Sequence, residues 1–92
     1  MKDAIQVIKA RYESIMSEMS YYKQEIDIAK ARFVDGNFDE MCEANDRLKY
    51  YKDEYNSGVT TLIELEFILE EIGYKVYEDW DNEKLILSYI TL

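Results

Sequence analysis

The stretch that decides the fold is Lys2–Phe33, KDAIQVIKARYESIMSEMSYYKQEIDIAKARF. Its apolar residues recur at alternating spacings of three and four, which is a period of 3.5 sustained over four heptads. Such a period is typical of a long helix that packs lengthwise against another helix. The pattern therefore predicts a helix over about 3–34 whose buried seam is Ile5, Ile8, Tyr12, Ile15, Met19, Tyr22, Ile26, Ala29 and Phe33.

The residues after this helix predict a sharp reversal of the chain. Gly36 suits the left-handed position that closes a helix, and Asn37 suits the N-cap of the next one. A second helix over about 38–55 would then form an antiparallel hairpin with the first, covering little more than half of it. Three residues near the N-terminus would remain uncovered by this hairpin, and either a dimer partner, in a possible dimer seam, or a later third helix should cover them: Ile5, Ile8 and Tyr12.

Asn56-Ser57-Gly58 predicts a second break, followed by a third helix over about 61–72 that ends at Gly73. From Tyr74 the period changes to alternation, which predicts a β-hairpin over about 74–90. A turn at Asp81-Asn82 would pair Tyr74 with Tyr89, Val76 with Leu87 and Asp79 with Lys84. The predicted fold is α+β and mostly helical, of the form ααα-ββ, in one domain over 1–92.

Charge is the second strong feature of this 92-residue chain, which has a formal net charge of −9. Residues 1–34 are nearly balanced at +1, whereas residues 35–56 carry −4 and residues 57–92 carry −6. This distribution disfavours direct binding to nucleic acid or to an anionic membrane, because both need a clustered basic face. A single cysteine and the absence of a long apolar run predict a cytoplasmic protein without an internal disulfide.

Residues that could carry chemistry are few. The chain has no histidine, and Cys42 falls on the apolar side of the second predicted helix, where a small buried side chain is expected. Two acidic loops, at 35–39 and 79–83, start like calcium loops but lack glycine at the sixth position. The sequence predicts a non-enzymatic protein with no cofactor and no metal site.

The acidic C-terminal part is the most suggestive surface. Its carboxylates can serve solubility alone. They can also form a partner-binding face with three aromatic anchors, because Trp and Tyr often dominate interface energetics. The candidate residues are Glu64, Glu66, Phe67, Glu70, Glu71, Tyr77, Glu78, Asp79, Trp80, Asp81 and Glu83.

In size and composition, though in no motif, the chain resembles the small acidic inhibitors that phages and mobile elements direct against host nucleic-acid enzymes. That resemblance implies a protein partner with a basic surface, such as a CRISPR or restriction nuclease, and nucleic-acid mimicry as the mode of action. The alternative hypothesis is a coiled-coil dimerisation or adaptor module, whose acids serve only solubility and whose function lies in the helix seam.

Overall fold

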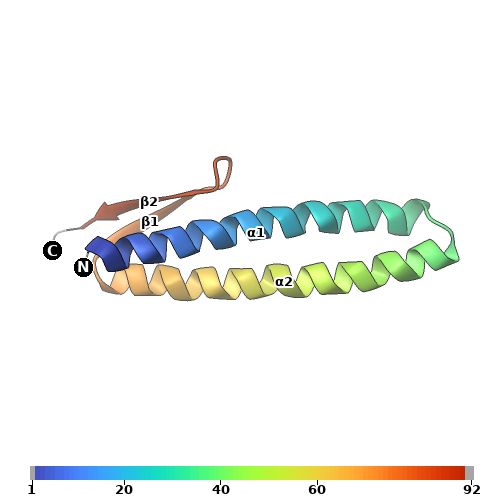
Figure 1. Ribbon diagram of the computed structural model, residues 1–92, viewed down its shortest axis with the longest axis horizontal. Coiled ribbons are helices and arrows are strands. Elements are labelled where there is room, and N and C mark those ends of the chain that lie inside the picture. Colours follow the sequence, from blue (N-terminus) through green and yellow to red (C-terminus); the bar gives the residue numbers. More distant parts are fainter. Residues whose placement is uncertain (1, 91–92) are drawn as a thin grey trace.

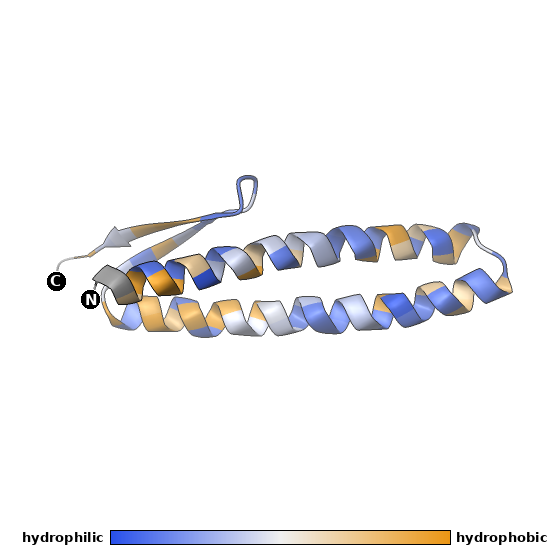
Figure 2. Ribbon diagram, viewed as in Figure 1, coloured by the Kyte–Doolittle hydropathy of each residue, from blue (hydrophilic) through white to orange (hydrophobic). Residues whose placement is uncertain are grey.

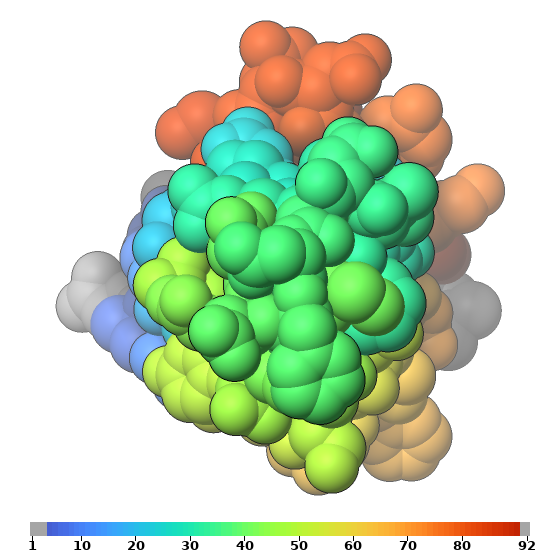
Figure 3. All heavy atoms as spheres, turned by 90° about the vertical axis from the view of Figure 1, so that its right-hand side faces the viewer, coloured from blue at the N-terminus to red at the C-terminus, as the bar shows by residue number. Residues whose placement is uncertain are grey.

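The computed structural model describes residues 2–90 and their side chains from Ala4 onward. Two long helices, α1 (Lys2–Asp35) and α2 (Phe38–Glu71), run antiparallel and are followed by a hairpin of β1 (Tyr74–Asp79) and β2 (Lys84–Tyr89) (Figure 1). The molecule is a rod of 59 × 20 × 20 Å. The hairpin folds back along one side of the helix pair (Figures 1 and 3).

The seam predicted on α1 is confirmed over most of its length. Ile5, Tyr12, Ile15, Met19, Ile26 and Ala29 are buried and Ile8 and Tyr22 are half-buried, while Phe33 near the helix end is exposed. Met16 is also fully buried, although it lies outside the seam. The hairpin covers this side of α1, so α1 buries a wider stripe than a two-helix coiled coil requires.

The prediction of three helices is wrong, because α2 runs without interruption from Phe38 to Glu71. The predicted break at residues 56–58 and the predicted start near Thr61 both lie inside it. The Thr60 and Thr61 hydroxyls do not cap a new helix; they donate to the carbonyls of Asn56 and Ser57 one turn earlier.

The packing of α2 explains why glycine is accepted inside this helix. A Cβ on Gly58 would lie 2.7 Å from Cγ of Met19 and 3.0 Å from its Sδ, so the missing side chain lets the two helices approach closely. The contact face of α2 keeps the same three-four spacing on both sides of this glycine. Its positions are Met41, Ala44, Leu48, Tyr51, Tyr55, Gly58, Leu62, Leu65 and Leu69.

The connection between the helices lies where the sequence placed it. Asn37 caps α2 as predicted, since its side chain accepts a hydrogen bond of 2.9 Å from the backbone N–H of Glu40. Gly36 does not adopt the predicted left-handed conformation; a Cβ there would instead lie 2.6 Å from the Arg32 carbonyl oxygen. Cys42 was predicted to be buried and is exposed, because Met41 and Ala44 take the helix contact instead.

The β-hairpin is confirmed together with its register, including the pairs Tyr74 with Tyr89, Val76 with Leu87 and Asp79 with Lys84. The Tyr74 and Tyr89 rings meet edge to face at 5.3 Å. The Glu83 N–H closes the turn around Asp81-Asn82 by donating to the Trp80 carbonyl. Leu85 is the deepest apolar residue of the hairpin, at 1% exposed.

The main core lies in the half of the rod that the hairpin covers (Figure 2). It joins residues of all three parts of the fold: Ile5, Tyr12, Ile15, Met16, Met19, Leu62, Leu69 and Leu85. Ile5, Ile8 and Tyr12 were expected to be covered by a dimer partner or by the third predicted helix, and the structure covers them within one chain. The C-terminal half of α2, which contains the residues assigned to that third helix, covers them together with the hairpin.

Candidate partner-binding surface

The hairpin is attached to α1 by three polar contacts in addition to its apolar face. The Tyr12 hydroxyl donates to Glu78 at 2.8 Å, and the Ser17 hydroxyl donates to Glu83 at 2.6 Å. The Glu13 carboxylate accepts from the backbone N–H of Leu85 at 2.9 Å. This last bond satisfies a donor on the outer edge of β2, where an open strand edge would otherwise invite pairing with another chain.

Tyr12 is the central residue of this attachment. Its side chain is completely buried, and burial together with the neighbouring Glu78 carboxylate raises the pKa of its hydroxyl far above the ordinary value of 10.0. The hydroxyl therefore stays protonated and donates to Glu78 at any physiological pH.

Because of these contacts, fewer of the predicted partner-binding carboxylates are free to contact another protein. Glu78 and Glu83 are half-buried and hydrogen-bonded to α1, and Asp79 accepts from the side chain and backbone of Asn82 within the turn. These three predicted site residues act first as structural acceptors.

A second group of carboxylates meets where α2 passes β1. Burial, followed by the negative charges of Glu70 and Glu78, raises the pKa of Glu66 above its ordinary value of 4.5. Glu66 is half-buried and lies close enough to Glu78 of β1 for the two charges to interact. Like charges are thus concentrated at the junction of α2 and β1.

Seven of the predicted site residues remain on the surface. Three are aromatic: Phe67 is 62% exposed, Tyr77 is 65% exposed on the outer face of the hairpin, and Trp80 is 40% exposed at its turn. Four are exposed carboxylates: Glu64, Glu70, Glu71 and Asp81. We name these seven residues the acidic end; they are distributed over the C-terminal half of α2 and the hairpin that packs on it.

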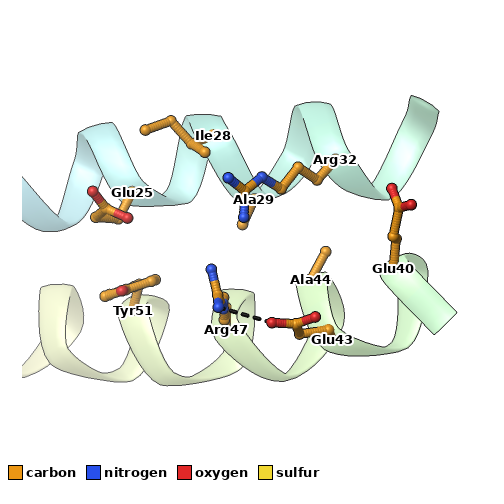
Figure 4. A pocket seen from close by; sticks show the side chains of 9 residues that line it. All are labelled: Glu25, Ile28, Ala29, Arg32, Glu40, Glu43, Ala44, Arg47 and Tyr51. Atoms are coloured by element: carbon orange, nitrogen blue, oxygen red, sulfur yellow. Dashed lines mark hydrogen bonds and ion pairs between the residues drawn. The ribbon is translucent and has the colours of Figure 1, made fainter. Parts of the chain in front are cut away.

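Two hollows lie beside the helix pair. One, of about 350 Å³, lies between Trp80 and the helices and is lined by Met19, Ser20, Lys23 and Tyr55. The other, of about 210 Å³, opens between α1 and α2 where Ala29 and Ala44 keep the contact thin (Figure 4). Arg32 and Arg47 extend into it from the two helices, and Arg47 forms an ion pair of 2.8 Å with Glu43.

The second hollow has no excess of positive charge, since its two arginines are outnumbered by three glutamates: Glu25, Glu40 and Glu43. Within residues 2–90, no three side chains of the metal-binding types are placed so that they could hold an ion. None of the helices in this described range has the length and apolar character needed to cross a membrane.

Sequence reasoning missed the polar residues that attach the hairpin, Glu13 and Ser17. A polar residue beside a helix seam has the same sequence signature whether it faces water or a strand edge, so no local signal could have found them. Comparison with protein-family models, with curated proteins and with solved structures found no match.

Proposed function

We propose that this protein is a non-enzymatic binding protein whose acidic end occupies a basic, nucleic-acid-binding surface of another protein. The observation that carries the proposal is the combination, in the half of the rod that carries the hairpin, of three exposed aromatic side chains with four exposed carboxylates. Exposed aromatic residues of this size have a solvation cost that a partner would relieve. The surrounding carboxylates would steer a basic partner toward them.

The charge distribution supports the same proposal. Residues 35–92 carry −10 while α1 is nearly neutral, so the negative field comes from α2 and the hairpin. A phosphate-binding cleft on a host nuclease, of the CRISPR or restriction type, has the complementary charge. Binding there would exclude DNA or RNA from the cleft, which is inhibition by nucleic-acid mimicry.

The test is capture of the partner from cells that contain it, followed by competition with nucleic acid. The captured protein should bind nucleic acid itself, and added DNA or RNA should displace it from this protein. The complex should also weaken steeply as salt is raised, because the carboxylates are solvent-exposed. A partner that binds nucleic acid and this protein at the same time would contradict mimicry.

Two matched variants locate the surface. Glu70→Lys/Glu71→Lys reverses two charges beside Phe67, and Asp46→Lys/Asp53→Lys reverses two exposed charges in the other half of α2. Both change the net charge from −9 to −5. Only the first should weaken binding by about tenfold or more, whereas equal loss in both would show a general charge effect.

The alternative function, a coiled-coil dimerisation module, cannot use the seam first considered for it without opening the monomer. Ile5 and Tyr12 are buried within one chain, and Ile8 packs against the same core. A dimer of the folded chain needs another surface.

A further inference from the structure

The β-hairpin has an outer edge on the side of β2. Its sheet has only two strands among the described residues, so β2 pairs with β1 along one edge and with no strand along the other (Figure 1). Glu13 accepts from the Leu85 N–H, which shows that this N–H points away from β1. Because N–H groups alternate in direction along a strand, the N–H and C=O groups of Leu87 and Tyr89 also point to the outer edge.

The outer edge is closed at Leu85 and open beyond it. Within residues 2–90, no hydrogen bond is made to the outward N–H of Leu87 or Tyr89. The next residue, Ile90, donates in the other direction, to the Gly73 carbonyl at 2.7 Å, as the alternation requires. Two N–H and two C=O groups at strand spacing are the hydrogen-bonding complement of an extended chain.

A hollow of about 590 Å³ lies beside this open edge, between β2 and the first turns of α1. Ile5 and Lys9 line it from α1, and Leu85 and Leu87 line it from β2. In a strand added to β2, the residue opposite Leu87 has its side chain on the same face of the sheet as Leu87. That side chain would enter the hollow, so the space lies where a third strand needs it.

The chemistry of the surroundings selects the side chains of such a strand. The wall of the hollow is largely apolar, and Lys9 disfavours a basic side chain inside it. On the outer face, Ile86 is 49% exposed and pairs across the hairpin with Tyr77, which is 65% exposed. The next residue of an added strand lies beside Ile86, where an apolar side chain would cover part of it.

We propose that the open edge of β2 binds an extended segment of another protein as a third, antiparallel strand. The segment has an apolar residue opposite Leu87 and another opposite Ile86. It is short, because Glu13 already occupies the N–H of Leu85 and ends the pairing there. Antiparallel pairing is the more stable type for a given length. The contact is made by backbone groups that the acidic end does not use, so it does not rest on the function proposed above.

A second copy of this chain is the competing occupant, because its own β2 edge has the same open groups. Charge opposes that pairing, since each copy carries −9. A neutral segment of another protein meets no such repulsion.

The probe is the uncharged peptide acetyl-Thr-Thr-Val-Ile-Thr-amide, which places Val opposite Leu87 and Ile opposite Ile86. In amide NMR spectra of the labelled protein, peptide at millimolar concentration should shift the signals of Leu87, Tyr89 and the first turns of α1. The hydrogen exchange of the Leu87 and Tyr89 amides should slow, because both become donors to the peptide. Binding should change little with salt, unlike binding through the acidic end.

Two N-methylated forms of the peptide test the backbone pairing. The N–H of the Val residue donates to the Leu87 carbonyl in the proposed strand, whereas the N–H of the Ile residue points away from β2. N-methylation at Val should therefore weaken binding by about tenfold or more, and N-methylation at Ile, which adds the same group, should weaken it little.

A pair of protein variants tests the same edge from the other side. Tyr89→Pro removes only an outward N–H, a position where an edge strand tolerates proline. It should weaken binding by about tenfold relative to Tyr89→Ala, which also removes the ring and keeps the donor. Should Tyr89→Pro unfold the hairpin, the N-methylated peptides decide the question.

Equal binding of the two N-methylated peptides would overturn the proposal, as would unchanged Leu87 and Tyr89 signals at millimolar peptide. Shifts of the same two signals with protein concentration alone would also overturn it, because they would show a second copy on the edge.

Discussion

Tyr12 shows how a single residue can belong both to the apolar core and to the attachment of the hairpin. Its ring lies in the helix seam, and its hydroxyl reaches Glu78 on β1. The sequence pattern put Tyr12 in a possible dimer seam and Glu78 in the candidate partner-binding set. In the structure these two side chains are hydrogen-bonded to each other.

Replacing Tyr12 with Phe should test this contact, because the ring stays while the hydrogen bond is lost. We expect the free energy of unfolding to fall by about 1 kcal/mol, since Glu78 is only half-buried and regains water. Chemical denaturation of Tyr12→Phe measures the change, and Tyr77→Phe, at an exposed ring, is the matched control. An equal effect in both variants would mean that the Tyr12–Glu78 bond contributes nothing.

Glu66 gives a prediction for the dependence of stability on pH. Its pKa is raised in the folded state, so the folded protein holds this proton more tightly than the unfolded chain does. The contribution of Glu66 to the stability of the fold is therefore complete below pH 4.5, the ordinary pKa of the group. It falls as the pH rises through the raised pKa and stays low above that. Ionised Glu66 destabilises the fold at neutral pH.

Glu66→Gln should accordingly raise the Tm slightly at pH 7, and the gain should vanish well below pH 4.5. Thermal unfolding at the two pH values measures it. Glu64→Gln removes an exposed carboxylate two residues away and should leave the Tm almost unchanged at both. A gain for Glu66→Gln that persists in acid would show that charge is not its cause.

At the scale of the elements, the continuity of α2 depends on a glycine that a side chain from α1 covers. Glycine inside a helix costs about 1 kcal/mol relative to alanine. The close packing of Met19 and Ile15 over Gly58 offsets that cost. The same residue that indicated a helix end in the sequence is thus a packing position in the fold.

A double-mutant cycle tests this role of Gly58. Gly58→Ala should destabilise the protein by about 1 kcal/mol, because the new methyl group overlaps the buried Met19 by more than alanine's helix propensity recovers. In a Met19→Ala background the same change should stabilise the protein by about 0.5–1 kcal/mol. Denaturant titration of the wild type, the two single variants and the double variant gives the coupling energy between Gly58 and Met19. If Gly58→Ala changes the stability equally in both backgrounds, Gly58 does not pack against Met19.

At the scale of the whole molecule, the two halves of the rod are stabilised unequally. The half near the hairpin holds the main core cluster, in which two helices and a β-hairpin share a continuous apolar interior. The half near the connection has only two helices, which meet at Ala29 and Ala44 beside a polar hollow. Few buried contacts imply easy local opening.

Hydrogen exchange should therefore separate the halves. Amides over about 24–50 should exchange at least tenfold faster than those of residues 8–19 and 58–69, in both helices at once. Exchange measured by mass spectrometry on peptides from each range reports this difference. Equal protection along the whole of both helices would mean that the rod opens only as one unit.

The sequence by itself determined the seam of α1, the Asn37 cap and the register of the β-hairpin, because each rests on a local spacing. The three-four spacing of the contact face of α2 was also present in the sequence, from Met41 through Gly58 to Leu69. Local propensity nevertheless favoured a helix end at Asn56-Ser57-Gly58, and the spacing alone did not exclude it. Only the tertiary structure decided that α2 is continuous, since the packing of Met19 on Gly58 joins residues far apart in the chain. Because α2 is continuous, Tyr12 is buried and its hydroxyl donates to Glu78. The predicted surface is thereby reduced to the residues of the acidic end.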